Sequence, residues 1–475
     1  MRRVPYPSVR VLLVIATAAW IAGFAALSVL RQEAFATGRF DLGNMVQAVW
    51  STAHGHLLQV TDLQGDQVSR LGAHVDPILA LFAPLWWIWS SPNMLLVVQA
   101  VGVGLGAIPV YWLARKHLRS ARAGLGFALV YLAYPATGWL TLNEFHPVAL
   151  ATPLLLFAFW FLDEDRLVPF AVFAVAAAAC KEEIPFVIAG FGVWYAVSRR
   201  RWIEGGAIAV LGVAWAAVAT TVVIPHFNHG QTSDFYTRYS EVGGSPGGIV
   251  KTAFTHPGRL AHAAFTGRDL HYALQLLWPL AFLPLLSPLV LVAALPELAI
   301  NVLSAVTTQT SIHFHYTAGL IAPLVIAAIF GAHRIGRRAF WVAAAAVLVA
   351  VAGNYRLGPV PAWEHVPGGQ RFQARASDVT AHDRIAADAL RLIPENAVVT
   401  ATNSLGAHLS ARRRVLSFPF IQDATWIAAD ETQPGYADRY APVATAEQLV
   451  WLRRNPEWKL VFERDGVLVF HRLVS

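Results

Sequence analysis

Charged residues and cysteines are scarce in this sequence. Asp, Glu, Lys and Arg together make up 14% of the 475 residues, against roughly 25% in a typical soluble domain. The single cysteine, Cys180, excludes an intramolecular disulfide and a site built from several thiolates. Neither a P-loop nor a dinucleotide-binding glycine fingerprint is present, which excludes nucleotide binding through those two motifs.

Apolar runs, in contrast, are long and numerous. Hydrophobic residues make up 56% of the chain, and several runs reach the roughly 20 residues needed to cross a bilayer. The first, residues 11–30, is longer than a signal-peptide core and favours an uncleaved span. We therefore predict an all-α polytopic membrane domain over residues 1–353. Its expected spans, about eleven, are 9–30, 93–113, 123–142, 147–162, 167–180, 184–198, 205–225, 272–286, 288–303, 316–333 and 339–354.

Basic residues give this domain an expected orientation. They cluster in alternate connections, where the positive-inside rule places the cytoplasm, at Arg2, Arg3 and Arg10, at 115–122, at 199–201 and at 334–338. This explains the net charge of +7 without a nucleic-acid partner. Loops 31–92 and 226–271 then face outward. The tryptophan-rich segment 77–90 within the first loop favours an interfacial helix over another span.

From residue 354 the composition becomes arginine-rich and resembles that of a soluble protein. Residues 381–393 have helical periodicity, whereas 397–402, 414–418 and 458–472 have the pattern of strands. The last of these predicts a hairpin that turns at Asp465–Gly466. We expect a small extracytoplasmic α/β domain over residues 354–475.

The first outward loop carries a concentration of carboxylates and imidazoles. Asp41 precedes a short amphipathic helix, so it is either a helix cap or a functional carboxylate. In the second case it is a general base towards a hydroxyl group or a ligand of a divalent cation. His74 and Asp76, in the segment LGAHVDP, are further catalytic candidates, although His-x-Asp spacing is common by chance.

Four other connections bring polar residues to the same predicted face. Ionisable groups at such positions are costly unless they face a cavity, yet each pattern is also compatible with internal polar contacts or an exposed turn. Lys181 is a natural partner for a phosphate group. We group the candidates as phosphate-binding (Lys181, Glu182, His313 and His315) and as cavity-lining (Glu144, His146, Glu297 and Asn301).

Five sequence blocks carry a resemblance to a bacterial family of predicted multi-span membrane proteins of unknown function. They are FDLGNMVQAVW, LGAHVDPILALFAPLW, CKEEIP, PELAINVLS followed by HFHY, and IPENAVVTATNSLGAHLSARRRVLSFP, in which Ala407 replaces an expected proline. At superfamily level, the chain is similar to the GT-C glycosyltransferases, which transfer sugars from polyprenyl-phosphate carriers. An adjacent second acidic residue, present in many of them, is missing beside Asp41.

The resemblance implies a glycosyltransferase of the bacterial cytoplasmic (inner) membrane. Its donor is a polyprenyl-phosphate-linked sugar, and its acceptor is a cell-envelope glycan, lipid or protein. Asp41 assists an inverting-type attack, and Lys181, with His313 or His315, stabilises the leaving phosphate. A transporter or flippase of a lipid-linked or polar solute is the main alternative, and a non-catalytic membrane scaffold is a third. The need for a divalent cation stays open.

Overall fold

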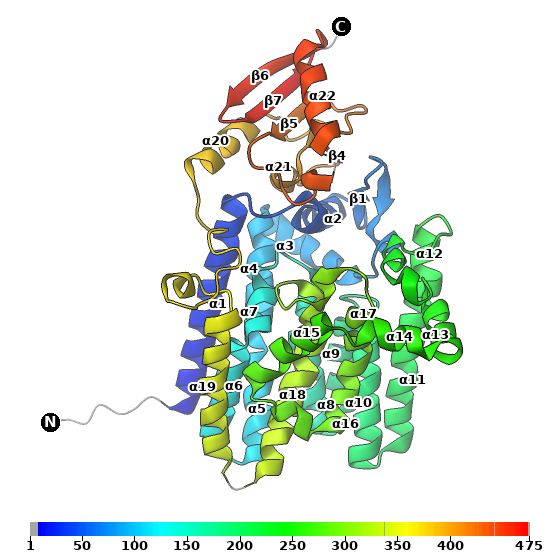
Figure 1. The fold of residues 1–475 in the computed structure, drawn as a ribbon, viewed down its shortest axis with the longest axis vertical. Helices are drawn as coiled ribbons and strands as arrows, with labels where there is room; N and C mark the ends of the chain where they lie inside the picture. The colour runs from blue at the N-terminus through cyan, green and yellow to red at the C-terminus, as the bar shows by residue number, and fades with distance from the viewer. Residues whose placement is uncertain (1–7, 337, 441, 474–475) are drawn as a thin grey trace, which may run out of the picture.

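The computed structural model describes residues 8–336, 338–440 and 442–473. The chain forms a tall helical bundle with a small α/β domain stacked on one end (Figure 1). Three arginines used to predict the orientation, Arg2, Arg3 and Arg337, lie outside the described residues.

The bundle consists of apolar helices of unequal length. Five are long and apolar enough to cross a membrane, and a sixth would be the pair α6–α7, which is bent by 47°. The sequence-based count of eleven spans stays a prediction, because the remaining apolar helices are shorter than 18 residues. The bundle helices are α1 (Val9–Glu33), α4 (Pro92–Leu105), α5 (Ala107–Leu118), α6 (Ala121–Ala133), α7 (Pro135–Leu142), α8 (Ala151–Asp163), α9 (Leu167–Ala178), α10 (Ile184–Arg199), α11 (Trp202–Val218), α12 (Ile224–Phe227), α16 (Pro288–Leu291), α17 (Leu295–Val302), α18 (Ala318–Ile335) and α19 (Ala339–Leu357).

One expected span, residues 272–286, is not a continuous helix. Helix α15 (Gly267–Leu277) ends there, and two short 3₁₀ turns follow, each with a proline in its first turn: Pro279 and Pro284. Proline lacks the amide hydrogen that would continue the helical ladder. The break therefore has a local cause that a hydropathy count does not detect.

Small residues allow α10 and α11 to pack closely. A Cβ atom added to Gly192 would lie 2.6 Å from the carbonyl oxygen of Gly205, and one added to Gly212 would lie 2.6 Å from that of Pro185. Close backbone approach at small residues is a common basis of helix association in membranes. These two helices therefore form a tight antiparallel pair.

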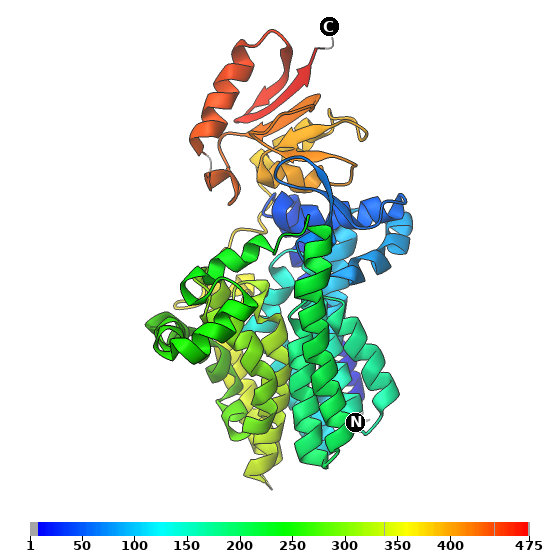
Figure 2. The ribbon, with the colours of Figure 1, turned by 90° about the vertical axis from the view of Figure 1, so that its right-hand side faces the viewer.

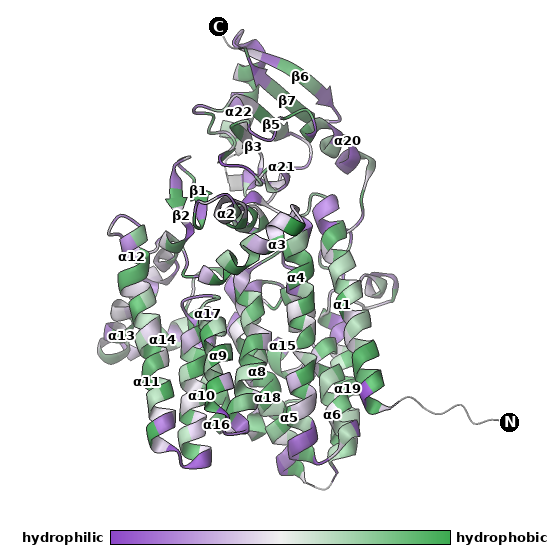
Figure 3. Ribbon diagram, turned by 180° about the vertical axis from the view of Figure 1, so that it is seen from behind, coloured by the Kyte–Doolittle hydropathy of each residue, from purple (hydrophilic) through white to green (hydrophobic). Residues whose placement is uncertain are grey.

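One group of charged turns lies at the end of the bundle opposite to the α/β domain. In Figure 3 these turns carry hydrophilic colour, below the apolar helices. The Asp163 side chain, 1% exposed, forms ion pairs with Lys116 (2.7 Å), His117 (2.9 Å) and Arg199 (2.9 Å). This network joins the ends of α5, α8 and α10.

The first loop covers the other end of the bundle. It contains a single π-helical turn, η1 (Arg39–Gly43), followed by α2 (Asn44–Ala53) and a short antiparallel hairpin of β1 (Gln59–Thr61) and β2 (Gln67–Ser69). The tryptophan-rich segment forms a 3₁₀ turn, η3 (Pro77–Phe82), and α3 (Ala83–Ile88). Two short helices of the other loop, α13 (Pro246–Thr255) and α14 (Pro257–Ala264), project from the side of the bundle (Figure 2).

The C-terminal domain is built on a five-stranded mixed sheet in the order β4-β3-β5-β7-β6. The first three strands are parallel, and β5, β7 and β6 are antiparallel neighbours. Strand β5 was not expected from the sequence, while the hairpin at Asp465–Gly466 was. The elements are α20 (Ala381–Leu390), β3 (Val399–Ala401), α21 (Asn403–His408), β4 (Val415–Ser417), β5 (Trp426–Asp430), α22 (Pro442–Arg454), β6 (Trp458–Arg464) and β7 (Val467–Arg472).

Arg39 fastens the first loop to this domain. Its side chain is buried, and its guanidinium donates to the carbonyl oxygens of Val415 (2.7 Å) and Thr61 (2.7 Å) and to Ser417 Oγ (2.6 Å). Several charge-assisted hydrogen bonds offset the cost of burying the charge. The loop and the domain therefore hold a fixed relation to each other at the end of the bundle.

Candidate functional site

Asp41 lies in the π-helical turn η1, where the first loop meets the C-terminal domain. The backbone groups of this turn, not the Asp41 side chain, begin α2, and the N-cap residue Gly43 makes no side-chain cap. The prediction that Asp41 caps this helix is therefore wrong. Instead, Oδ2 accepts a hydrogen bond from the Tyr436 hydroxyl (2.7 Å), and Oδ1 lies 3.3 Å from His146 Nε2. Such π-turns are frequent at functional sites.

The contacts of His146 show where its protons lie. Its Nδ1 faces the carbonyl oxygen of Asn143 at 2.7 Å, which only accepts, so Nδ1 carries a hydrogen. Its Nε2 faces Asp41, and one proton must therefore lie between the imidazole and the carboxylate. Burial would raise the pKa of Asp41, but the hydrogen bonds from His146 and Tyr436 hold it below its usual value. Asp41 and His146 can therefore share one proton between them.

Glu144 lies directly beneath this turn. Its Oε2 accepts the backbone amides of Gly38 (3.0 Å) and Leu42 (2.9 Å), which fixes the turn that carries Asp41. Burial, together with the nearby Asp41 charge, raises the pKa of Glu144 to about 8. Gln99, on α4, holds the Glu144 loop through its amide. Glu144 therefore positions Asp41 and is itself largely protonated at neutral pH.

A line of aromatic rings leads from Asp41 into the second polar cluster. His146 stacks on His315, with 3.7 Å between ring centroids, and His315 contacts the ring of Tyr316 (4.2 Å). The Lys181 ammonium lies 5.8 Å from the centroid of that Tyr316 ring. Residues as far apart in the sequence as Asp41 and Tyr316 thus form one continuous surface.

Residues 181–183, here called the KEE segment, supply two ion pairs to this second cluster. Lys181 Nζ lies 2.5 Å from Glu183 Oε1, and Glu182 Oε1 lies 2.8 Å from His74 Nδ1. Burial would lower the pKa of Lys181, but Glu183 and Glu182 hold it above its usual value. Burial would raise the pKa of Glu182, whereas His74 draws it down to about 2. Lys181 is therefore already paired with a carboxylate before any ligand binds.

Arg238, from the loop of residues 226–271, is a cation that the sequence analysis missed. Its guanidinium lies over the rings of Phe235 (4.6 Å) and Tyr316 (5.9 Å) and donates to the Tyr316 hydroxyl at 3.3 Å. Phe235 also stacks on His74 at 4.6 Å. Within the described ranges, Arg238 forms no ion pair. It therefore offers an uncompensated positive charge beside Lys181.

Three further predicted site residues form no hydrogen bond or ion pair with Asp41 within the described ranges. Asp76, buried, pairs with Arg70 at 3.0 Å and shares no hydrogen bond or ion pair with Asp41 within the described ranges. Asn301 donates to the Tyr272 hydroxyl and the Tyr316 carbonyl oxygen, which is a structural role. Glu297, buried near Lys181, packs against Gly319.

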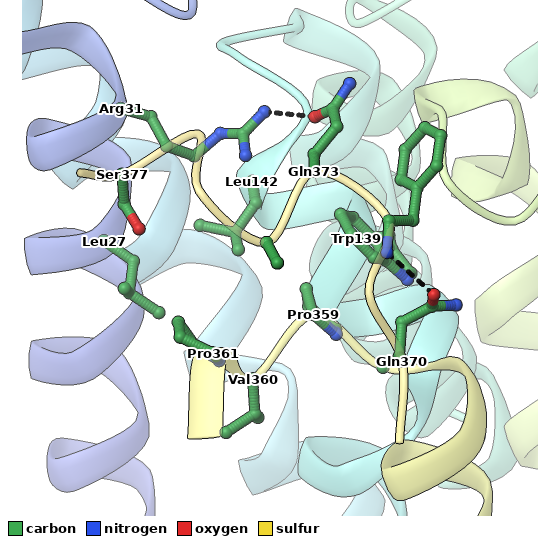
Figure 4. Close-up of a pocket in the computed structure, with 13 residues that line it drawn as sticks. Leu27, Arg31, Trp139, Leu142, Pro359, Val360, Pro361, Gln370, Gln373 and Ser377 are labelled. Carbon is green, nitrogen blue, oxygen red and sulfur yellow. Dashed lines mark hydrogen bonds between the residues drawn. The ribbon is translucent and has the colours of Figure 1, made fainter. Parts of the chain in front are cut away.

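His313 does not join His315, although the two are only two residues apart. It stacks on Phe372 (4.2 Å) and contacts Trp139, beside a small pocket between α1, α7 and the segment after α19. Burial lowers the pKa of His313 to about 4. Figure 4 shows this pocket, with Arg31 donating to Gln373 Oε1 (2.6 Å). His313 is thus neutral and turned towards the tail, away from Asp41.

Tyr436 and Asn143 were also missed from the sequence. Tyr436 lies in a loop of the C-terminal domain with no recognisable motif, so no local signal could have placed it. Asn143 directly precedes the predicted Glu144–His146 turn, and its Oδ1 accepts from the backbone amide of His315 (3.0 Å). Of the residues the structure describes, no three His, Cys, Asp or Glu side chains form a group that could hold a metal ion.

Residues 31–469 match the family described as "Predicted membrane protein (DUF2079)". The chain belongs to this family. Its matched range includes every residue of the Asp41 and Lys181 clusters. None of the curated proteins compared matches the chain in sequence.

Among solved structures, the chain is similar to ArnT from Cupriavidus metallidurans. The crystal structure with bound undecaprenyl phosphate has a TM-score of 0.48 at 12% identity, covering 95% of this chain and 98% of that one. The apo structure has a TM-score of 0.48 at 14% identity, covering 96% and 98%. A likeness of this degree assigns no activity or ligand to the DUF2079 protein.

Proposed function

We propose that this DUF2079 protein is a membrane glycosyltransferase that uses a polyprenyl-phosphate sugar. The main support is that two kinds of group lie on one continuous polar surface. Asp41 and His146 form a proton-accepting pair, and Lys181 and Arg238 are two cations beside Tyr316 on that surface. The superfamily-level similarity of the chain to the GT-C glycosyltransferases, which implies Asp41 as the aspartate of the first loop, supports the same class.

In the proposed reaction, the acceptor hydroxyl attacks the anomeric carbon of the donor sugar. Its proton passes to the Asp41 carboxylate, a new glycosidic C–O bond forms, and the bond from the anomeric carbon to the phosphate oxygen breaks. The electron pair leaves with that oxygen as polyprenyl phosphate. A positioned general base contributes about 10²–10⁴ in rate.

Arg238 and Lys181 have different parts in this scheme. The guanidinium of Arg238 pairs with no carboxylate among the residues that the structure describes, and it can bind phosphate oxygens in a bidentate manner. Lys181 is paired with Glu183, so its ammonium group is not free to bind the phosphate alone. It still adds positive charge to the electrostatic potential around the phosphate. We assign the leaving phosphate to Arg238 first, with Lys181 supporting it. His74 and Glu182 hold Phe235 and the KEE segment in place.

The decisive experiment compares Asp41→Asn with Asp66→Asn, an exposed carboxylate of the same loop. Membranes containing each protein receive a panel of radiolabelled polyprenyl-phosphate hexoses, and transfer to endogenous acceptors is counted. We expect wild type and Asp66→Asn to transfer label, and Asp41→Asn to fall by about 10²–10⁴ with an unchanged melting temperature. An equally active Asp41→Asn protein would refute the role of Asp41.

Phosphate recognition is tested separately by binding. Purified protein is titrated with undecaprenyl phosphate and with undecaprenol, which lacks the charge. Arg238→Gln should weaken binding of the phosphate but not of the alcohol, whereas Arg259→Gln, an exposed arginine of the same loop, should change neither. Equal binding of phosphate and alcohol by the wild type would contradict the proposed donor class.

A further inference from the structure

An apolar groove runs along α1 at the end of the bundle far from Asp41. Its volume is about 430 Å³, and its walls come from α1 on one side and α4 and α5 on the other. The apolar lining includes Val14, Ile21, Leu105 and Trp112. Because α1 is largely exposed along a candidate membrane span, this groove opens towards the lipid.

Two arginines stand together at one end of the groove. Helices α1 and α5 run in opposite directions here, because Gly104, before α5, packs on Ile21 at the far end. Arg10 and Arg115 therefore both line the near end of the groove. Neither forms an ion pair with any described residue.

The position of Arg10 is unfavourable for its own helix. It lies in the first turn of α1, which has no acidic residue, where the helix dipole favours negative charge. An anion bound at this place would gain from the two guanidinium groups and from the N-terminal end of α1, whereas the C-terminal end of the antiparallel α5 favours Arg115 itself. The local charge thus calls for a negatively charged ligand.

Thr17 also lines the groove and brings a buried hydroxyl group to its wall. Thr17 is 6% exposed, and its Oγ1 has no hydrogen-bond partner in the described chain. It lies seven residues from Arg10, or about 10 Å along the helix. A buried hydroxyl without a partner is costly. The spacing suits a ligand with an anionic head at the arginines and an ester carbonyl deeper in the groove.

We propose that this groove binds an anionic phospholipid. Its phosphate lies between Arg10 and Arg115, an ester carbonyl accepts from Thr17, and one acyl chain fills the apolar walls. The apolar groove distinguishes this ligand from a free phosphate, and the net positive charge distinguishes it from a zwitterionic lipid. The site is independent of the proposed glycosyltransferase reaction at the other end of the bundle.

Native mass spectrometry of the full-length protein tests the proposal. Phosphatidylglycerol and phosphatidylcholine of equal chain length are added in turn, and sn-glycerol 3-phosphate serves as the head group without chains. We expect phosphatidylglycerol to bind at least tenfold more tightly than phosphatidylcholine, and glycerol phosphate not to compete. Equal affinity for the two lipids, or competition by glycerol phosphate, would overturn the proposal.

Matched variants locate the binding. Arg10→Gln combined with Arg115→Gln should weaken phosphatidylglycerol binding about tenfold or more. Arg119→Gln combined with Arg122→Gln removes the same charge from exposed arginines outside the groove and should have little effect. Val14→Trp, which fills the groove, should lower the binding of both lipids. Equal losses in the two double variants would show a diffuse surface effect and would refute the site.

Discussion

The Tyr436 hydroxyl donates a 2.7 Å hydrogen bond to Asp41 Oδ2, although the two residues are 395 positions apart. Tyr436 reaches Asp41 from a loop that Asp438 organises by accepting the backbone amides of Asn403 (2.9 Å) and Gly435 (2.8 Å). The C-terminal domain therefore takes part directly in the candidate active site and does more than cover the bundle.

Tyr436→Phe should shift the pH dependence of the proposed sugar transfer. A hydrogen bond to the charged carboxylate lowers its pKa, so losing this bond raises the pKa of Asp41. The acid limb of the rate profile should move to higher pH, which is measured with the labelled donor between pH 4 and 9. Tyr355→Phe, outside the site, is the control. An unmoved acid limb would mean that Tyr436 does not act on Asp41.

Lys181→Met should lower stability because it leaves Glu183 buried without its partner. Breaking a buried ion pair costs about 3–5 kcal/mol, whereas replacing both partners is far less costly. The double change Lys181→Met with Glu183→Gln should therefore recover most of the melting temperature. Lys251→Met, at an exposed lysine, should leave it unchanged.

The same proteins distinguish the two roles of Lys181. If the double variant is stable but binds undecaprenyl phosphate more weakly than wild type, the Lys181 charge also serves the donor. If it is stable and binds normally, Lys181 has only a structural role, and Arg238 alone serves the phosphate. Failure of the double variant to recover stability would contradict the ion-pair explanation.

Features of the fold that depend on local sequence were predicted well. Apolar runs gave the positions of most bundle helices, and Asp465–Gly466 gave the hairpin turn, with both residues at positive φ. Strand β5 was missed, since its sequence, WIAAD, is short and ends in a charge. The broken segment after α15 was missed because mean hydropathy ignores where prolines fall.

The candidate site was only partly predictable, because its partners come from distant segments. The sequence singled out polar residues at the ends of apolar runs, among them Asp41, His146, Lys181 and His315. These four residues do lie along one surface. It gave no means to pair Tyr436 with Asp41, and Arg238 looked like an ordinary loop arginine. Such pairings depend on tertiary packing, which one sequence does not reveal.

Glu144→Gln should change how stability depends on pH. The pKa of Glu144 is about 8 in the folded protein and about 4.3 in an unfolded chain. Wild-type stability should therefore decline as pH rises from about 4.3 to about 8, because the folded protein disfavours the charged Glu144 carboxylate relative to the unfolded chain. The neutral amide removes this decline. Melting temperatures at pH 5 and 8.5 should show Glu144→Gln gaining on the wild type; parallel curves would contradict the raised pKa.

His382 should make the C-terminal domain less stable at high pH. Its Nε2 lies 2.8 Å from Asp430 and its Nδ1 lies 2.9 Å from Asp465, so both ring nitrogens face carboxylates. Burial would lower the pKa of His382, but these two hydrogen bonds raise it above its usual value near 6.5. The stabilisation is complete below about pH 6.5 and is lost as pH rises through the folded-state pKa.

Because Asp430 also accepts the amides of Thr432 and Gln433 (both 2.9 Å), the effect of His382 should extend to the loop that carries Tyr436. Amide hydrogen exchange of α20 and of the 431–440 loop, corrected for intrinsic rates, should show protection at pH 6 that falls by pH 9. His382→Gln should have low protection at both pH values, whereas His365→Gln, at an exposed histidine, should behave as the wild type. Equal protection of the wild type at pH 6 and 9 would show that the two ion pairs do not hold the domain, since only a charged imidazolium can donate to both carboxylates at once.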